Sequence, residues 1–448
     1  MMNRFLNVLA ICLLSLLAAW PGLADQPGSG QDNVLIDISA GLLQALVPPD
    51  IDETQDQRDV ILEIPVVARA RVRAKGQATL FPDANNAVLD FTLRGTSMAS
   101  LVATPPDQAV IAYANSATYF TVGKRIYLNS AGLGSYPARA TARVNIELKK
   151  ITTTQGRTDT PLTNVAEVVF EVQKRPFENS GARKSEAELT KQVDDQFRLL
   201  LTQANKSFSD GLSQIRAVGV PLRQLRFSTS SSLMSVGARI ALTDAGPPLT
   251  PVPRLEAPFD LGLRVHQSAI NEGAQSALAG KTFSASDLST IPLNMKMLAH
   301  VAAAHVMLEQ VAREPIKDAS LTFADHAPLV VVFAHHGFTV TANVKEFRAA
   351  GLRLPGLTVK AVYKLTNAAG RCEAVRQGPV QISPYYGHKI GSHVLGALLE
   401  HRLNATFKER IAIPDLQPPA TLSQIGTLVP VRADADNGWI VACWARKK

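Results

Sequence analysis

The side chains best suited to metal binding are nine histidines, all of which fall within residues 266–401. Two histidines bind one metal ion from a single helix when they stand four residues apart on the same face. Here the separated pairs stand five residues apart: His300 with His305, and His388 with His393. His335 and His336 are adjacent and would point to opposite faces of a strand. These spacings favour surface or hydrogen-bonded histidines, and we expect no metal site and no other cofactor.

A candidate nucleophile is Ser97, in the string Gly95-Thr96-Ser97-Met98-Ala99-Ser100. This string resembles the serine motif of subtilisin-like proteases, but Leu101 stands where that motif has a proline. The candidate partner His336 follows Ser97 along the chain, whereas in that family the serine comes last. A triad is recognised by geometry and roles rather than by a short string. We therefore predict no enzymatic activity and expect Ser97 at a strand end or bulge.

Four cations alternate with small apolar residues in one predicted strand, so that all four would line one face: Arg69, Arg71, Arg73 and Lys75. One interpretation is an anion contact, for instance with a phospholipid or lipopolysaccharide head group. The alternative is a solvated outer face, on which acidic residues of neighbouring strands relieve the repulsion. The second interpretation is favoured, because exposed strand faces are commonly charged.

Two cysteines remain once the first 24 residues are set aside, Cys372 and Cys443. Both lie in apolar, strand-like surroundings, and an even number of cysteines in an oxidising compartment usually forms a disulfide. A bridge would close a loop of roughly 70 residues and stabilise the fold by about 4 kcal/mol if unstrained. The alternative is two separate buried thiols that pack as small hydrophobic side chains.

The first 24 residues have the features of a cleavable secretory signal peptide. One charge, Arg4, precedes an almost purely apolar run over residues 8–20, and Gly22-Leu23-Ala24 supplies small residues for cleavage. The run is too short to span a bilayer comfortably. We expect cleavage after Ala24 and a protein that works in the periplasm or outside the cell, which excludes cytosolic nucleotide chemistry.

The charge balance argues against nucleic acid as a partner. The chain has a net charge of +8, and loss of Arg4 lowers this to +7. The positive excess is spread along the chain instead of forming a basic stripe. It suits an anionic membrane or cell-wall surface, although the simpler reading is that it serves solubility alone.

The positioning elements divide at a proline-rich stretch. We predict four parts: a signal peptide over 1–24, an N-terminal α+β module over 25–245, a semi-rigid linker over 246–258 and a C-terminal α+β module over 259–448. In each module, long antiparallel strands are covered by long amphipathic helices. The predicted fold class is therefore α+β.

In the first module, two-residue alternation predicts strands over 61–81, 87–94, 143–149 and 165–172. A capping box at Ser185 starts a predicted helix of about 30 residues. In the second module we predict strands over 261–265, 329–333, 338–344, 359–365 and 439–444, and helices over 268–279, 295–311 and 393–410. The two modules begin alike, each with a short apolar strand that leads into a helix.

This order of elements resembles the tubular lipid-binding (TULIP) superfamily. The stretches with the likeness are residues 260–271 and 328–344. The chain also resembles uncharacterised exported bacterial proteins, through strings such as residues 123–128, 137–140 and 438–440. The superfamily resemblance implies a curved sheet wrapped on a helix around an apolar groove for an acyl chain, and it transfers no ligand-contact residue.

Three functional hypotheses follow in order of preference. The first is an exported, non-enzymatic protein that binds lipid or another hydrophobic ligand. The second is a structural or protein-interaction module of the cell envelope, with an envelope surface or envelope protein as its partner. The third is an unrecognised hydrolase that uses Ser97. A continuous apolar tunnel would favour the first hypothesis, and a filled core would favour the second.

Overall fold

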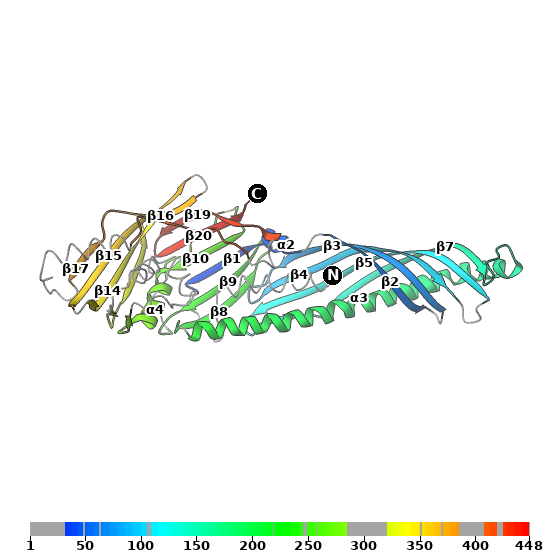
Figure 1. The fold of residues 1–448 in the computed structure, drawn as a ribbon, viewed down its shortest axis with the longest axis horizontal. Helices are drawn as coiled ribbons and strands as arrows, with labels where there is room; N and C mark the ends of the chain where they lie inside the picture. The colour runs from blue at the N-terminus through cyan, green and yellow to red at the C-terminus, as the bar shows by residue number, and fades with distance from the viewer. Residues whose placement is uncertain are drawn as a thin grey trace.

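The computed structural model describes residues 32–447 except for 48–49, 62–63, 105–108, 218, 245–248, 257, 285–319, 350–351, 369–370, 385–406 and 419–423. The described chain is elongated and built on three antiparallel sheets, one at each end and one between them (Figure 1). The predicted signal peptide and the predicted helix over 295–311 lie outside the described residues, as does all but the end of the helix predicted over 393–410.

The N-terminal sheet is made of long strands that curve together. It contains β2 (Ile51–Ile61), β3 (Ile64–Phe81), β4 (Ala87–Ala103), β5 (Val110–Asn129), β6 (Gly132–Ser135) and β7 (Arg139–Thr153). The strands run in the order β2-β3-β4-β5, and β6 and β7 both pair with β5 along its other side. Buried and exposed residues alternate along β3, as expected of a sheet with one wet face.

The helix α3 (Pro161–Ala217) runs beneath these strands and has 57 residues, or about 85 Å of helix (Figure 1). The prediction of a helix over its second half is confirmed, but the strand predicted over 165–172 is wrong, because this stretch is helical. The error arises because Val165, Val168, Val169 and Val172 are β-branched, and such residues are enriched in strands. Pro176 also lies within the helix.

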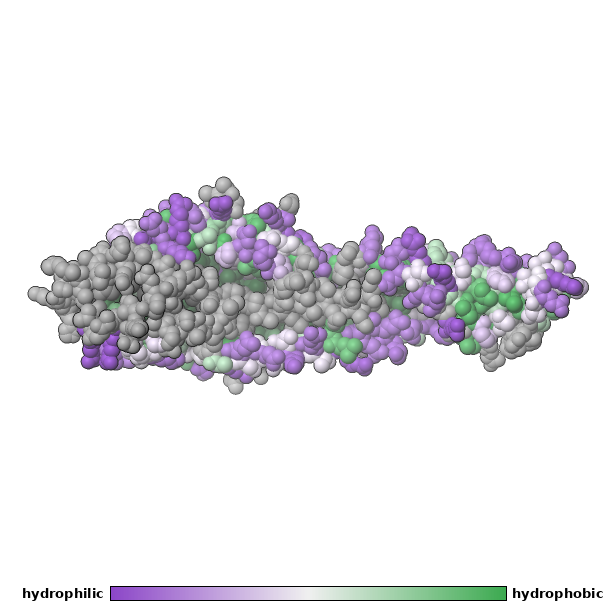
Figure 2. Space-filling view, in the orientation of Figure 1, coloured by the Kyte–Doolittle hydropathy of each residue, from purple (hydrophilic) through white to green (hydrophobic). Residues whose placement is uncertain are grey.

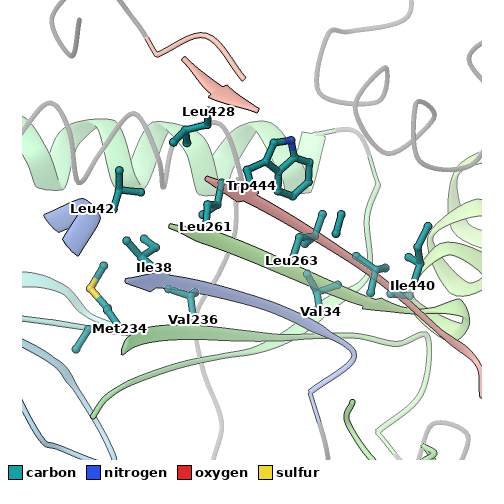
Figure 3. Close-up of a cluster of buried hydrophobic side chains, with 14 of the residues drawn as sticks. Val34, Ile38, Leu42, Met234, Val236, Leu261, Leu263, Leu428, Ile440 and Trp444 are labelled. Carbon is teal, nitrogen blue, oxygen red and sulfur yellow. The ribbon is translucent and has the colours of Figure 1, made fainter. Parts of the chain in front are cut away.

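The central sheet has the strand order β19-β20-β10-β1-β9-β8. Its members are β1 (Val34–Ser39), β8 (Leu222–Thr229), β9 (Leu233–Ile240), β10 (Leu261–His266), β19 (Leu428–Asp436) and β20 (Trp439–Arg446). Helices α2 (Ala40–Ala45) and α4 (Gln267–Leu278) follow β1 and β10. The similar openings of the two halves are therefore neighbouring antiparallel strands, and their apolar residues meet in one core (Figure 3).

The third sheet includes β11 (Thr282–Ser284), β12 (Ser320–Phe323), β13 (Leu329–Ala334), β14 (Gly337–Ala349), β15 (Leu352–Ala368), β16 (Arg371–Arg376), β17 (Gln381–Pro384) and β18 (Arg410–Ala412). Three strands predicted for the second half fall within β13, β14 and β15. The ring of Tyr363 on β15 stacks on the ring of Phe338, with the ring centres 5.0 Å apart, and it forms part of the core of this sheet.

The predicted fold class, two α+β modules each covered by long helices, is wrong. The described chain is mostly strand, in three antiparallel sheets with only three helices, and α3 is the only long one among them. The central sheet also hydrogen-bonds strands from before and after the proline-rich stretch. Residues 249–256 of that stretch lie against this sheet, since Arg264 and Trp439 donate side-chain hydrogen bonds to the carbonyls of Pro253 and Thr250.

Candidate functional site: the tube between the N-terminal sheet and α3

The helix α3 seals one edge of the N-terminal sheet with its side chains. Glu178 accepts a hydrogen bond from the backbone N–H of Ile146, and Glu186 accepts one from Ala142, each at 2.9 Å. Asp194 does the same for Ala138, also at 2.9 Å. The acceptors recur every eight helical residues and the donors every four residues along β7 and its approach. An edge strand that would otherwise offer free N–H groups is thus partnered by a helix.

The same helix reaches the opposite edge of the sheet. Lys184 donates a hydrogen bond to the carbonyl oxygen of Val60 on β2 at 3.2 Å, and α3 packs against β2 as well as β5, β6 and β7. Because β2 and β7 are the two flanks of the curved sheet, the helix contacts both of its edges, and we call this closed sheet-and-helix layer the tube.

The inner face of the tube is lined with small side chains midway along the sheet. Strand register places six inward-facing residues, none larger than valine, in two adjacent rows: Val72, Ser97 and Thr118, then Ala70, Ala99 and Ser116. We call these six the small-residue floor. All except Ala70 retain partial exposure although they face inward. Solvent therefore reaches the inner face at these residues. An apolar chain of a ligand could lie against the same surface.

Two hydrophobic clusters border the small-residue floor. On the side of the central sheet, Phe120 and Ala74 belong to the main core. On the other side, Leu101 and Ala114 meet a separate small cluster, against which Phe170 and Phe177 of α3 are also packed. The two further members of this cluster, Val144 and Ile146, lie on β7 directly beside Thr118 and Ser116 of the floor. Gly95 and Leu101 mark the two borders on β4, and the six residue-to-residue steps from one to the other span about 20 Å.

A buried ion pair lies in the tube on the side of the main core. Lys124 faces inward from β5, its side chain is only 4% exposed, and its ammonium group forms an ion pair with Asp194 of α3. The ammonium group also lies 5.7 Å from the centre of the Phe197 ring. The Asp194 carboxylate thus pairs with the buried cation and also accepts the hydrogen bond from the Ala138 N–H. The pair ties β5, α3 and the entry to β7 together.

The predicted basic face lies on the outside of the tube, on β3. Each of its four cations has a carboxylate from β2 or the residue preceding it within 4.0 Å: Arg69 with Asp56, Arg71 and Arg73 with Asp52, and Lys75 with Asp50. The hydrogen bond from Arg71 lowers the pKa of Asp52. This is the arrangement expected of a solvated face with acidic neighbours, and the anion contact stays a prediction.

The cysteines predicted to form a disulfide, Cys372 on β16 and Cys443 on β20, are both free and buried in this structure. Burial raises the pKa of both thiols, that of Cys443 to about 11. They therefore correspond to the alternative of two buried thiols, and the predicted bridge is not formed.

The residues considered for catalysis are separated in the fold. Ser97 lies within the regular β3–β4–β5 ladder, not at a strand end or bulge, whereas His336 lies in the β13–β14 turn of the third sheet. His335 and His336 have φ values of 54° and 58°, so they form the turn instead of alternating along a strand. His336 pairs with Asp434 at 2.9 Å. Within the described ranges, no three or more histidine, cysteine, aspartate or glutamate side chains are grouped so as to hold a metal ion.

The first turns of α3 present an apolar stripe to solvent. Val165 is 61% exposed and Val172 is 71% exposed. The stripe follows three- and four-residue steps, and its members are Leu162, Val165, Val168, Val169 and Val172. Hydrophobic side chains gather near this end of the molecule (Figure 2). None of the helices in the described chain is both long and apolar enough to cross a membrane.

Sequence reasoning did not identify the small-residue floor. The sequence of β3 does contain a signal for an inner face of small residues. Ala68, Ala70 and Ala74 alternate there with the four cations of the outer face. Within the floor, the inward positions of β4 and β5 hold serine, threonine and alanine, so hydrophobic alternation there is too weak to show which face is buried. Only the strand register shows that these residues are neighbours.

No family profile and no curated protein matches the chain. Among solved structures, it is similar to a lipopolysaccharide binding protein, with 9% identity, a TM-score of 0.31, and coverage of 94% of this chain and 100% of the other. It is also similar to P47 from Clostridium botulinum A2, with 8% identity, a TM-score of 0.23, and coverage of 92% and 97%. Both likenesses are weak, and the resemblance to the TULIP superfamily stays a prediction.

Proposed function

We propose that this protein is a non-enzymatic binder of lipid or another hydrophobic ligand, which lies against the small-residue floor inside the tube. The observation that supports the proposal is the partial exposure of inward-facing residues such as Val72, Ala99 and Thr118. Inward-facing side chains in the middle of a closed sheet-and-helix layer are normally buried by packing. Here an apolar ligand would complete that packing.

The chemistry of the floor favours an unbranched apolar chain. Its side chains are alanine, valine, serine and threonine, which leave space above the sheet and offer hydroxyl groups but no charge. Binding sites for apolar ligands are typically hydrophobic with a few placed polar groups. An acyl chain fits this lining along the roughly 20 Å of β4 from Gly95 to Leu101.

We further propose that the protein is exported and meets its ligand in the cell envelope or outside the cell. The support is the signal peptide expected over residues 1–24. N-terminal sequencing of the protein recovered from the periplasm or medium tests this, with Asp25 expected at the terminus. Recovery of the full-length chain from the cytoplasm would contradict it.

The first test of ligand binding is native mass spectrometry of the mature protein purified from its own envelope, followed by titration with a fluorescent fatty acid. Preparations that repeatedly contain no lipid and bind no fatty acid would refute the proposal.

A matched pair of variants locates the site. Ala99→Phe puts a large ring on the inner face, whereas Ser100→Phe puts the same ring on the exposed outer face of the same strand. We expect the first variant to lose fatty-acid binding and the second to keep it. Equal binding by both variants would place the ligand elsewhere.

The second candidate function is a protein-interaction module of the envelope, and the exposed stripe on α3 supports it. Apolar residues at three- and four-residue steps form the seam with which helices pair. A pull-down from envelope extract with Val168→Asp as the comparison tests this function. A stoichiometric protein partner that the wild-type chain captures and the variant does not is the expected result, and equal capture would exclude the stripe as the interface.

A further inference from the structure

Phe120 stands at the border between the main core and the small-residue floor. It faces inward from β5, and its direct neighbours across the sheet are Gly95 on β4 and Ala142 on β7. A Cβ atom built on Gly95 would lie 2.6 Å from the Cζ atom of Phe120. The ring therefore lies over the glycine, and it can do so only because Gly95 has no side chain.

Exposure changes abruptly at this ring. Phe120 is 8% exposed, and Val122, the next inward-facing residue toward the central sheet, is 1% exposed. In the opposite direction the next inward-facing residue, Thr118, is partly exposed. Along β5 the packed interior thus ends at Phe120, and the accessible inner face begins beyond it. On β7 the inward-facing residues beside the floor, Val144 and Ile146, remain buried.

Behind Phe120 the interior has no further row of small side chains. Phe91 and Leu93 on β4 are buried, and Phe91 packs against Phe197 of α3 with ring centres 5.9 Å apart. A chain lying on the floor would meet the Phe120 ring end-on and could not pass without displacing it. Close-packed interiors resist such displacement, because there is little free volume to take up the ring.

We propose that Phe120 is the end wall of the ligand site and sets the longest apolar chain that the site accepts. This inference rests on the proposed lipid-binding function. Shortening the side chain opens space into which a longer chain can extend, whereas the floor itself and the opposite border are unchanged.

The experiment compares binding of saturated fatty acids of increasing length to the mature wild-type protein and to Phe120→Ala, by competition with a fluorescent fatty acid. Wild type should gain affinity with chain length up to a limit and then lose it. In Phe120→Ala that limit should move to longer chains. Beyond the wild-type limit, each additional methylene that becomes buried should raise affinity roughly fourfold.

Two controls separate the end wall from general effects. Tyr119→Ala removes an aromatic ring from the outer face of the same strand, where the side chain is 47% exposed. Phe91→Ala opens space in the core behind the wall. Both should keep the wild-type length limit. If Phe120→Ala does not fold, Phe120→Leu serves in its place, with a smaller shift expected.

The outcomes distinguish failure of the lipid-binding function from failure of the end wall alone. Wild-type protein that binds no fatty acid of any length overturns the lipid-binding function, and the end wall with it. Wild-type protein that binds fatty acids, with the same length limit in Phe120→Ala or Phe120→Leu, overturns the end wall alone. A shift that Phe91→Ala reproduces equally would show general loosening of the core and would also overturn the end wall.

Discussion

Substituting the two partners of the Lys124–Asp194 ion pair should change the free energy of unfolding by very different amounts. Lys124 is almost fully buried, and Asp194 is the only acidic partner seen for it in the described structure, although Asp194 itself is 36% exposed. Asp194→Ala would leave an ammonium group inside the tube without its counter-ion. It would also remove the acceptor of the Ala138 N–H.

The expected cost of Asp194→Ala follows from this burial. Removing one partner of a buried ion pair destabilises a protein by about 3–5 kcal/mol. Since Asp194 is partly exposed and water can enter where its carboxylate was, we expect a loss near the lower end, about 3 kcal/mol. Lys124→Met removes the buried charge and keeps an apolar stem, so it should change the free energy of unfolding by no more than about 1 kcal/mol.

Urea denaturation of the mature protein, followed by circular dichroism, measures both effects. The double variant Lys124→Met/Asp194→Ala should recover most of the stability that Asp194→Ala loses, because no unpaired charge remains. Asp195→Ala is the matched control. Its exposed pairs with Lys191 and Arg198 should contribute less than about 1 kcal/mol. If Asp194→Ala costs no more than Asp195→Ala, the reasoning about the buried charge is refuted.

Three further predictions concern the edge, the thiols and the third sheet. Glu186→Ala should destabilise the fold by about 1–2 kcal/mol and speed hydrogen exchange at the Ala142 amide, whereas Glu188→Ala, which lacks such a contact, should change exchange there little; equal exchange in both variants would contradict the edge contact. Cys372 and Cys443 should resist thiol reagents at neutral pH until the protein unfolds, because both are buried and their pKa values are raised; rapid labelling of the native protein would show the burial to be wrong. Asp434 raises the pKa of His336, so their pairing should stabilise the fold at low pH and be lost as pH rises through the raised pKa; in an NMR titration Asp434→Asn should lower that pKa, and an unchanged value would exclude the pair.

Much of the secondary structure could be predicted because it depends on local pattern. The strands of β10, β13 and β20 are short apolar runs between turn residues, and the second half of α3 has regular apolar spacing. The helix start predicted at Ser185 is wrong, because α3 is continuous from Pro161. The first half of α3 could not be predicted in the same way. Its valines favour strand by propensity, and the contacts of Phe170 and Phe177 with distant residues of β5 and β7 accompany the helical form.

The candidate site depends on pairings that a single sequence does not show. Ser97 and Thr118 are neighbours only because β4 and β5 pair in one register, and a shift of one residue in either strand would put the two side chains on opposite faces of the sheet. The Phe120 ring could be recognised as a border only once Gly95 was known to lie opposite. The predicted fold class was wrong because it also depends on long-range contacts. One long helix, α3, contacts both edges of a whole sheet, and the sequence does not show that pairing.

The spacing of the edge contacts has a consequence for how large such a tube can be. Eight helical residues rise about 12 Å, whereas four strand residues advance about 13 Å. The mismatch of roughly 1 Å adds up from one contact to the next, so helix side chain and strand N–H group move progressively out of alignment. After Glu178, Glu186 and Asp194 the next helix side chain to cap the sheet is Asn205, eleven residues further on, and it bonds both backbone groups of Leu133. A longer tube of this design would therefore need a new interval or a bent helix, and could not be made by repeating the eight-residue unit.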